Sequence, residues 1–199
     1  PELSWPGTQV RRLQAAANGQ RYTVTIWLPE GEPPAGGFPA LYVLDANALF
    51  GTVVEAVRRS SRRVDATGIG TAAVIGIAHE GDELFADAAR RRDYTSGPAR
   101  QAPPPSRSAG AEGGALAFLA FIADELLPQL QRELPLNPAQ QTLFGHSLAG
   151  YFVLQALAAR PQLFGHWAAI SPSIWWDEPG LRAALQATLA PKATGPAAH

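Results

Sequence analysis

An alternation of hydrophobic and polar residues near the start of the chain predicts a β-strand over residues 21–28. Its hydrophobic positions are Tyr22, Val24, Ile26 and Leu28. A stretch rich in glycine and proline follows, and residues 39–45 then form a short, continuous apolar run. Such a run is typical of a strand that is buried on both faces of a sheet.

The rest of the chain alternates between segments with the spacing of apolar residues typical of helices and short apolar runs typical of strands. Helical spacing of apolar residues predicts helices over residues 49–63, 116–130, 148–159 and 179–189, and short apolar runs predict strands over residues 72–78, 142–144 and 167–170. Strands that alternate with helices favour a mostly parallel sheet with helices on both faces. We therefore expect an α/β fold.

One region interrupts this pattern. Residues 79–114 are largely polar, and within them residues 96–114 are rich in proline, glycine and serine without any periodicity. We expect this shorter segment to be a flexible loop inside a single domain that spans residues 1–199. Loops of this length often serve as lids or substrate-binding segments.

Composition excludes several classes of protein. The formal net charge of −1 lacks the basic excess of a nucleic-acid binder, and the absence of cysteine excludes disulfides and thiolate sites. His79, Glu80, Asp82 and Glu83 lie close together, but a second histidine at ligand spacing is missing, so we expect no metal site and no cofactor. No apolar run is long enough to span a membrane. The compartment, periplasmic or cytoplasmic, stays open.

The candidate chemistry lies at a predicted strand-to-helix junction. Ser147 has Gly145 two positions before it and Ala149 two positions after it, which is the spacing of a nucleophile elbow with alanine in place of the last glycine. Small residues at these two positions let the strand and the helix approach each other closely. The elbow would present the Ser147 hydroxyl at the edge of the sheet, with the Leu148 N–H aimed at a developing oxyanion. We expect His146 to have a structural or substrate-lining role.

Five motifs, in order, resemble the putative esterase family of esterase D-like α/β-hydrolases. They are residues 44–47, Arg90 with residues 93–95, residues 118–128, residues 142–147 and residues 171–176. The resemblance is greatest to bacterial siderophore esterases, which open the ester ring of enterobactin and salmochelin. It implies an α/β-hydrolase fold and a serine esterase that cleaves siderophore trilactones through an acyl-enzyme on Ser147.

The same resemblance implies further site residues. Ala46, where the family usually has glycine, would supply the second oxyanion N–H. Arg90 and Tyr94 would flank the pocket, and a cationic Arg90 would suit an anionic ferric catecholate. An ordinary ion pair between Arg90 and a nearby acid is the alternative. Trp175 would offer a flat face to aromatic rings.

The catalytic base is not evident in the sequence. In α/β-hydrolases the histidine follows the serine along the chain, which leaves only His166 and His199. His166 is predicted to begin a strand, at the edge opposite the active site, and His199 ends a stretch rich in proline and alanine. We therefore expect that the family's last strands, with the base and any supporting acid, lie outside this sequence.

Two other functions are compatible with these residues. A catalytically inactive member of the family would bind a siderophore or another partner without cleaving it, and an acyltransferase of the same fold would pass the acyl group to an alcohol. As partner we expect a small-molecule ester, with no nucleic acid and no membrane span.

Overall fold

A six-stranded sheet forms the centre of the molecule. The computed structural model describes residues 6–100 and 112–190, and the order of the strands is β1-β2-β4-β3-β5-β6. The strands are β1 (Thr8–Gln14), β2 (Arg21–Trp27), β3 (Phe38–Leu44), β4 (Ala73–His79), β5 (Leu136–His146) and β6 (His166–Ile170). β1 and β2 are antiparallel to their neighbours, whereas β4, β3, β5 and β6 run parallel to one another. The sheet is therefore mostly parallel, as predicted.

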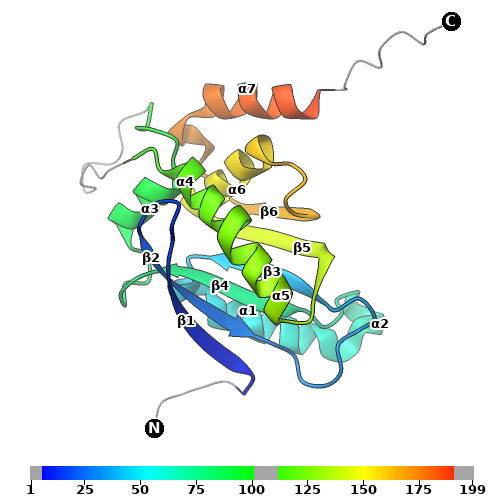
Figure 1. The fold of residues 1–199 in the computed structure, drawn as a ribbon. Coiled ribbons are helices and arrows are strands. Elements are labelled where there is room, and N and C mark those ends of the chain that lie inside the picture. Colours follow the sequence, from blue (N-terminus) through cyan, green and yellow to red (C-terminus); the bar gives the residue numbers. More distant parts are fainter. Residues whose placement is uncertain (1–5, 101–111, 191–199) are drawn as a thin grey trace, which may run out of the picture.

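Helices cover both faces of this sheet (Figure 1). They are α1 (Ala46–Ser60), η1 (Ser61–Arg63), α2 (Val64–Thr67), α3 (Asp87–Tyr94), α4 (Ala115–Ala120), the π-helical segment η2 (Phe121–Leu126), α5 (Leu127–Glu133), α6 (Leu148–Ala159), η3 (Ile174–Trp176) and α7 (Glu178–Leu189). α1 packs on one face through Phe50, Val54 and Val57. The helices α3 to α6 share the larger core on the other face, and α7 packs against α6. This is the α/β arrangement expected from the sequence.

Among the elements that the sequence analysis did not predict, β1 and α3 were missed for clear physical reasons. β1 is an edge strand with no buried residue, so it shows no hydrophobic alternation. α3 has the sequence DAARRRDY, and it buries Arg90, Arg91, Asp93 and Tyr94 instead of an apolar stripe. Charge pairing buries this helix, and hydrophobic periodicity cannot detect that. Its position also shows that the polar region from residue 79 is not a continuous loop.

The structure describes only the two ends of the proposed flexible loop over residues 96–114, because residues 101–111 lie outside the described residues. Its two described ends are anchored. Arg100 donates its backbone N–H to the Trp176 carbonyl, and the N–H groups of Gly113 and Ala115 donate to the Thr95 carbonyl. Within residues 6–100 and 112–190, no helix combines the length and the apolar character needed to cross a bilayer.

A buried carboxylate holds α3 onto the sheet. Asp93 is 1 % exposed and accepts hydrogen bonds from Tyr22 (2.8 Å), from His79 (3.1 Å) and from two nitrogens of Arg92 (2.7 Å each). Burial alone would raise the pKa of Asp93, but the hydrogen bonds from His79 and Arg92 outweigh burial and lower it. His79, which begins the polar region of the sequence, is a buried residue at the end of β4.

We predict that Asp93→Asn lowers the free energy of unfolding by about 3 kcal/mol at pH 7, because it removes the charge that Arg92 and His79 pair with. Since the folded protein lowers the pKa of Asp93, this stabilisation is present above the unfolded value of about 4 and is lost as the pH falls through the folded value. Denaturant unfolding of both proteins between pH 7 and pH 3 checks this. A difference that does not shrink in acid would contradict it.

Candidate active site

The elbow at Ser147 has the strained geometry that its sequence predicts. Ser147 follows the last residue of β5 and has φ 58° and ψ −118°, a conformation that non-glycine residues rarely adopt. A Cβ atom on Gly145 would lie 2.5 Å from the Ala149 carbonyl oxygen, and Ala149 is fully buried. Both positions therefore require small residues, as expected, because β5 and α6 touch here.

We predict that Gly145→Ala destabilises the protein by about 2 kcal/mol or more, because the added methyl group meets backbone atoms that cannot rotate away. Gly70→Ala is the matched control. A Cβ atom there meets nothing within 4 Å, so its effect should stay within about 0.5 kcal/mol. Thermal unfolding of both variants tests the prediction, and equal melting temperatures would contradict it.

Three strained residues lie side by side at one edge of the sheet. Asp45, Ser147 and Ser171 have positive φ values of 54°, 58° and 42°, and they are the only such non-glycine residues that the structure describes. Each directly follows the carboxyl end of a strand, and these strands, β3, β5 and β6, are neighbours in the sheet. Such strain tends to concentrate at functional sites, so this edge is the candidate active site.

Ser173 is a site residue that sequence reasoning did not single out. Its hydroxyl lies 3.2 Å from the Ser147 hydroxyl, and its N–H donates to the Ser147 carbonyl at 3.0 Å. The Ser147 N–H in turn donates to the Ile170 carbonyl at 3.0 Å. The loop after β6 therefore holds the elbow from the other side. Ser173 belongs to the motif over residues 171–176, but nothing in the sequence indicated that it contacts Ser147.

Two backbone N–H groups are available beside Ser147. The N–H groups of Leu148 and Ala46 have no hydrogen-bond acceptor among the described residues. In the parallel pairing of β3 with β5, Val43 lies opposite Phe144, and Ala46 and Ser147 each follow three residues later. The two turns therefore lie next to each other. This is the arrangement expected of an oxyanion hole formed by Ala46 and Leu148.

Arg90 and Tyr94 lie beneath the turn at Asp45 rather than in an open pocket. Arg90 is 6 % exposed, and its Nε and Nη2 atoms each donate to a carboxylate oxygen of Asp45 at 3.0 Å. Tyr94 is fully buried, and its hydroxyl donates to the same carboxylate at 3.1 Å. Burial and the nearby Asp45 charge raise the pKa of Tyr94 well above its ordinary value. The structure thus shows the ion-pair alternative for Arg90, and neither side chain presents a surface to a substrate.

The other two substrate-binding candidates are accessible. His146 is exposed at the end of β5, directly before Ser147. Trp175 is 37 % exposed in η3, two residues after Ser173, and its ring lies 5.6 Å from the buried ring of Trp176. Their role as substrate contacts stays a prediction.

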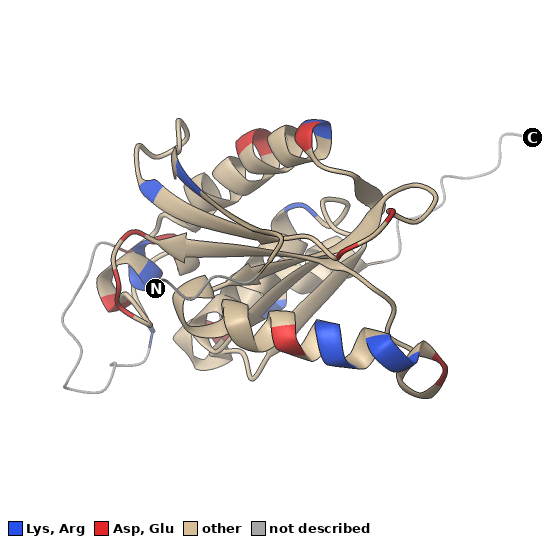
Figure 2. Cartoon of the chain, turned by 90° about the horizontal axis from the view of Figure 1, so that it is seen from below, with Lys and Arg blue, Asp and Glu red and all other residues tan. Residues whose placement is uncertain are grey.

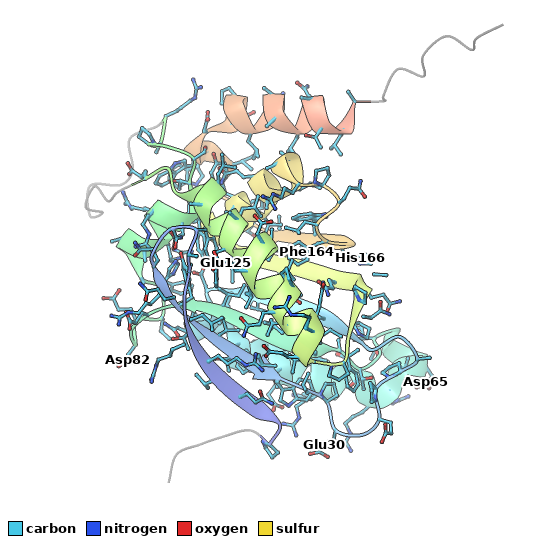
Figure 3. All side chains as sticks on the ribbon, in the orientation of Figure 1. Glu30, Asp65, Asp82, Glu125, Phe164 and His166 are labelled. Carbon is cyan, nitrogen blue, oxygen red and sulfur yellow. The ribbon has the colours of Figure 1, made fainter. Side chains whose placement is uncertain are left out.

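No histidine in the described part of the chain is placed to serve as the base for Ser147. His79 is bonded to Asp93, and His146 has no hydrogen bond to the serine. His166 begins β6, at the opposite end of the strand from Ser171, and Figure 3 shows it on the same side as Asp65 and Glu30, away from Asp82, which follows β4. His199 lies outside the described residues. Within those residues no group of three or more potential metal ligands occurs.

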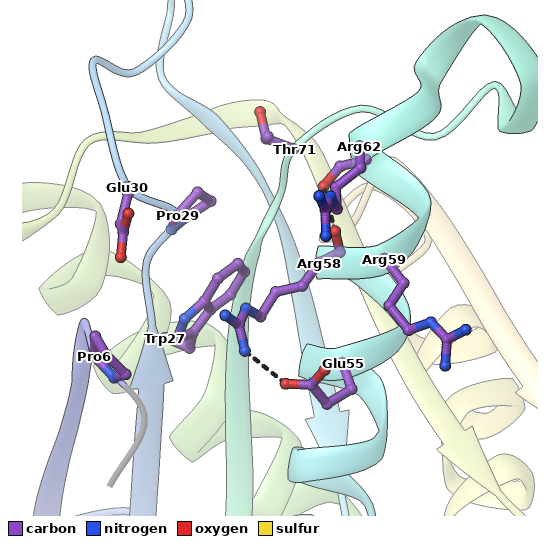
Figure 4. Close-up of a pocket in the computed structure, with 10 residues that line it drawn as sticks. Pro6, Trp27, Pro29, Glu30, Glu55, Arg58, Arg59, Arg62 and Thr71 are labelled. Atoms are coloured by element: carbon purple, nitrogen blue, oxygen red, sulfur yellow. Dashed lines mark hydrogen bonds and ion pairs between the residues drawn. The ribbon is translucent and has the colours of Figure 1, made fainter.

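A hollow of about 460 Å³ lies away from this site. It is lined by Trp27 and by residues from the last turns of α1, where Arg58 pairs with Glu55 at 2.6 Å (Figure 4). The basic residues near the end of α1 are visible as a series of blue bands in Figure 2. Trp27 pairs with Val74 at the start of β4, so this hollow lies at the edge of the sheet opposite Ser147.

Comparison with known proteins identifies the family. The family model described as "Putative esterase" matches residues 15–195. The chain belongs to the putative esterase family. The resemblance stated from the five motifs is therefore confirmed.

Two relatives of this chain carry the names of siderophore esterases. The chain is 43 % identical over 178 residues to the ferri-bacillibactin esterase BesA of Bacillus subtilis, an alignment that covers 87 % of this chain and 61 % of BesA. It is 35 % identical over 164 residues to the siderophore triacetylfusarinine C esterase of Aspergillus fumigatus, covering 80 % of this chain and 53 % of that protein. The chain thus spans somewhat more than half the length of these relatives.

Solved structures of the family agree with the fold. The crystal structure of the BES protein from Bacillus cereus superimposes with a TM-score of 0.86 at 31 % identity, covering 95 % of this chain and 70 % of that one. Siderophore hydrolase EstB from Aspergillus nidulans superimposes with a TM-score of 0.75 at 28 % identity, covering 94 % and 65 %. The α/β-hydrolase fold expected from the sequence is therefore confirmed.

Proposed function

We propose that this protein is a serine esterase in which Ser147 is the nucleophile. The observation that carries the proposal is the position of Ser147 in a strained elbow beside two N–H groups that have no acceptor among the described residues. Holding a hydroxyl in a costly conformation next to two free donors serves acyl transfer, because the tetrahedral intermediate carries a negative oxygen that such donors stabilise.

The chemistry proceeds in two steps. The Ser147 oxygen attacks the ester carbonyl, its proton passes to a base, and the N–H groups of Leu148 and Ala46 stabilise the oxyanion. When the carbonyl re-forms, the bond to the leaving alkoxide breaks, and the protonated base returns its proton to the alcohol. A water molecule then attacks the acyl-enzyme by the same route and regenerates Ser147.

We infer that the substrate is the ester of a siderophore. This inference rests on two relatives that carry the names of siderophore esterases and on the accessible residues around Ser147. The half-exposed face of Trp175 suits stacking on an aromatic ring such as a catechol, and His146 lies at the same edge of the sheet. Arg90 does not enter the proposed contacts, because Asp45 already takes up its charge.

Hydrolysis assays test the proposal. The protein is incubated with ferric enterobactin and ferric bacillibactin, and mass spectrometry follows the linear products, each of which gains one water molecule. Tryptophan fluorescence quenching without any product would show a binding module instead. A transferred acyl group in the presence of an added alcohol would show an acyltransferase. Absence of both binding and turnover would overturn the siderophore assignment.

A further inference from the structure

The two donors of the proposed oxyanion hole belong to elements on opposite faces of the sheet. The Ala46 N–H begins α1, whereas the Leu148 N–H begins α6. Because an oxyanion must contact both, their spacing has to hold to within a fraction of an ångström. Some part of the protein must therefore tie the turn at Asp45 to the elbow helix.

Asp45, directly before α1, has an unusual conformation and unusual hydrogen-bond partners for a residue at the start of a helix. Its backbone has φ 54° and ψ 44°, a left-handed conformation, and its carboxylate makes no cap hydrogen bond to α1. An aspartate at the start of a helix ordinarily accepts from the first free N–H groups. Here Arg90 and Tyr94 take up the carboxylate instead, and the N–H groups of Ala48 and Leu49 donate to the Asp45 carbonyl. The Ala46 N–H, at the first position of the helix, has no acceptor among the described residues.

Tyr94 also contacts the elbow helix. Its hydroxyl donates to the Asp45 carboxylate and lies 3.4 Å from the Asp45 N–H, which donates to it. Its backbone carbonyl accepts from Gln155 Nε2 of α6 at 2.8 Å, and its ring packs 5.7 Å from the Phe152 ring of the same helix. One buried residue therefore touches both elements that supply an oxyanion donor.

Arg90 fixes the same carboxylate from a second direction. It binds both carboxylate oxygens with two parallel hydrogen bonds, and its guanidinium lies 5.0 Å from the Phe85 ring and 5.8 Å from the Tyr94 ring. A planar fork of this kind restricts the rotation of the carboxylate, which a single point charge would not do.

We propose that Arg90 and Tyr94 are positioning residues that set the spacing between the Ala46 and Leu148 N–H groups, through the Asp45 carboxylate on one side and α6 on the other. This proposal rests on the esterase function proposed above. It replaces direct substrate contact as the role of these two residues. The expected signature is a loss in kcat with little change in KM, and the same loss for neutral and anionic esters.

The test compares two buried tyrosines. Tyr94→Phe removes the hydroxyl that binds Asp45, and Tyr22→Phe, the matched control, removes an equally buried hydroxyl that binds Asp93. Hydrolysis of p-nitrophenyl acetate and of ferric enterobactin is measured with imidazole present throughout, so that a base is supplied equally to all variants. We expect kcat to fall about tenfold or more for Tyr94→Phe on both esters, and to stay within about twofold for Tyr22→Phe. Arg90→Lys should behave as Tyr94→Phe does.

A second measurement requires no reactivity. Amide NMR spectra of the same proteins should show the Ala46 and Asn47 resonances broadened or split in Tyr94→Phe and Arg90→Lys, and unchanged in Tyr22→Phe. Unchanged amides together with unchanged kcat would overturn the positioning role. A loss confined to ferric enterobactin would also overturn it, in favour of substrate contact. If the unaltered protein is no more reactive than Ser147→Ala, the esterase proposal fails, and the NMR spectra still decide whether the two residues hold the turn.

Discussion

The Ser147→Ala variant should show no covalent labelling by a fluorophosphonate probe, and it should lose the esterase activity that the unaltered protein shows when imidazole supplies the base. The probe phosphonylates an activated serine, and among residues 6–100 and 112–190 only Ser147 combines a hydroxyl with a strained elbow and neighbouring free N–H groups. Intact-mass measurement before and after reaction checks the result. A single added phosphonyl group that disappears in the variant would support the assignment.

Ser173 provides the control, because its hydroxyl lies only 3.2 Å from that of Ser147. Its backbone has φ −74°, an ordinary value, and its N–H is already bonded to the Ser147 carbonyl. Ser173→Ala should therefore still be labelled, on the peptide that contains Ser147. Labelling that survives Ser147→Ala and disappears in Ser173→Ala would show that the nucleophile has been misassigned.

The second large effect concerns the base. We predict that the 199-residue protein reacts slowly with the probe and that added imidazole accelerates the reaction. General-base assistance is worth about 10²–10⁴ in rate, and no described histidine contacts Ser147. None of the described histidines would then be the base. Labelling rates measured against imidazole concentration test the prediction, with Ser147→Ala as the blank.

Histidine variants separate the alternatives. Fast labelling without imidazole that His199→Ala abolishes would identify His199 as the base. Fast labelling that depends on His146 would contradict the prediction, because His146 makes no hydrogen bond to Ser147 in the structure. His79→Ala should leave the slow rate unchanged, provided that the loss of its bond to Asp93 does not unfold the protein, which circular dichroism checks.

Hydrophobic periodicity was enough to predict the elements that pack by apolar burial. The strands over residues 21–27 and 73–79 and the helix over residues 148–159 agree with their predicted ranges to within a residue. β5 is longer than predicted, because its first half is polar and partly exposed. α3 was missed because its buried residues are charged, and an ion pair has no sequence period.

In the candidate site, too, local features could be predicted from the sequence and long-range contacts could not. The elbow around Ser147 is a local feature, so a five-residue pattern was sufficient to predict it. The pairing of Asp45 with Arg90 and Tyr94 joins residues more than forty positions apart, and the family motifs indicated these residues without their contacts. Ser173 likewise reaches Ser147 only through the fold.

The adjacency of β3 and β5 has an electrostatic consequence. The helices that follow these neighbouring strands leave toward opposite faces of the sheet, which makes this a topological switch point. The N-termini of α1 and α6 therefore lie at the same edge of the sheet, and each carries the equivalent of about half a positive charge. Together they can offset roughly one negative charge without any cationic side chain. Because backbone dipoles do not titrate, this part of the field at Ser147 should stay constant over the whole pH range in which the protein is folded.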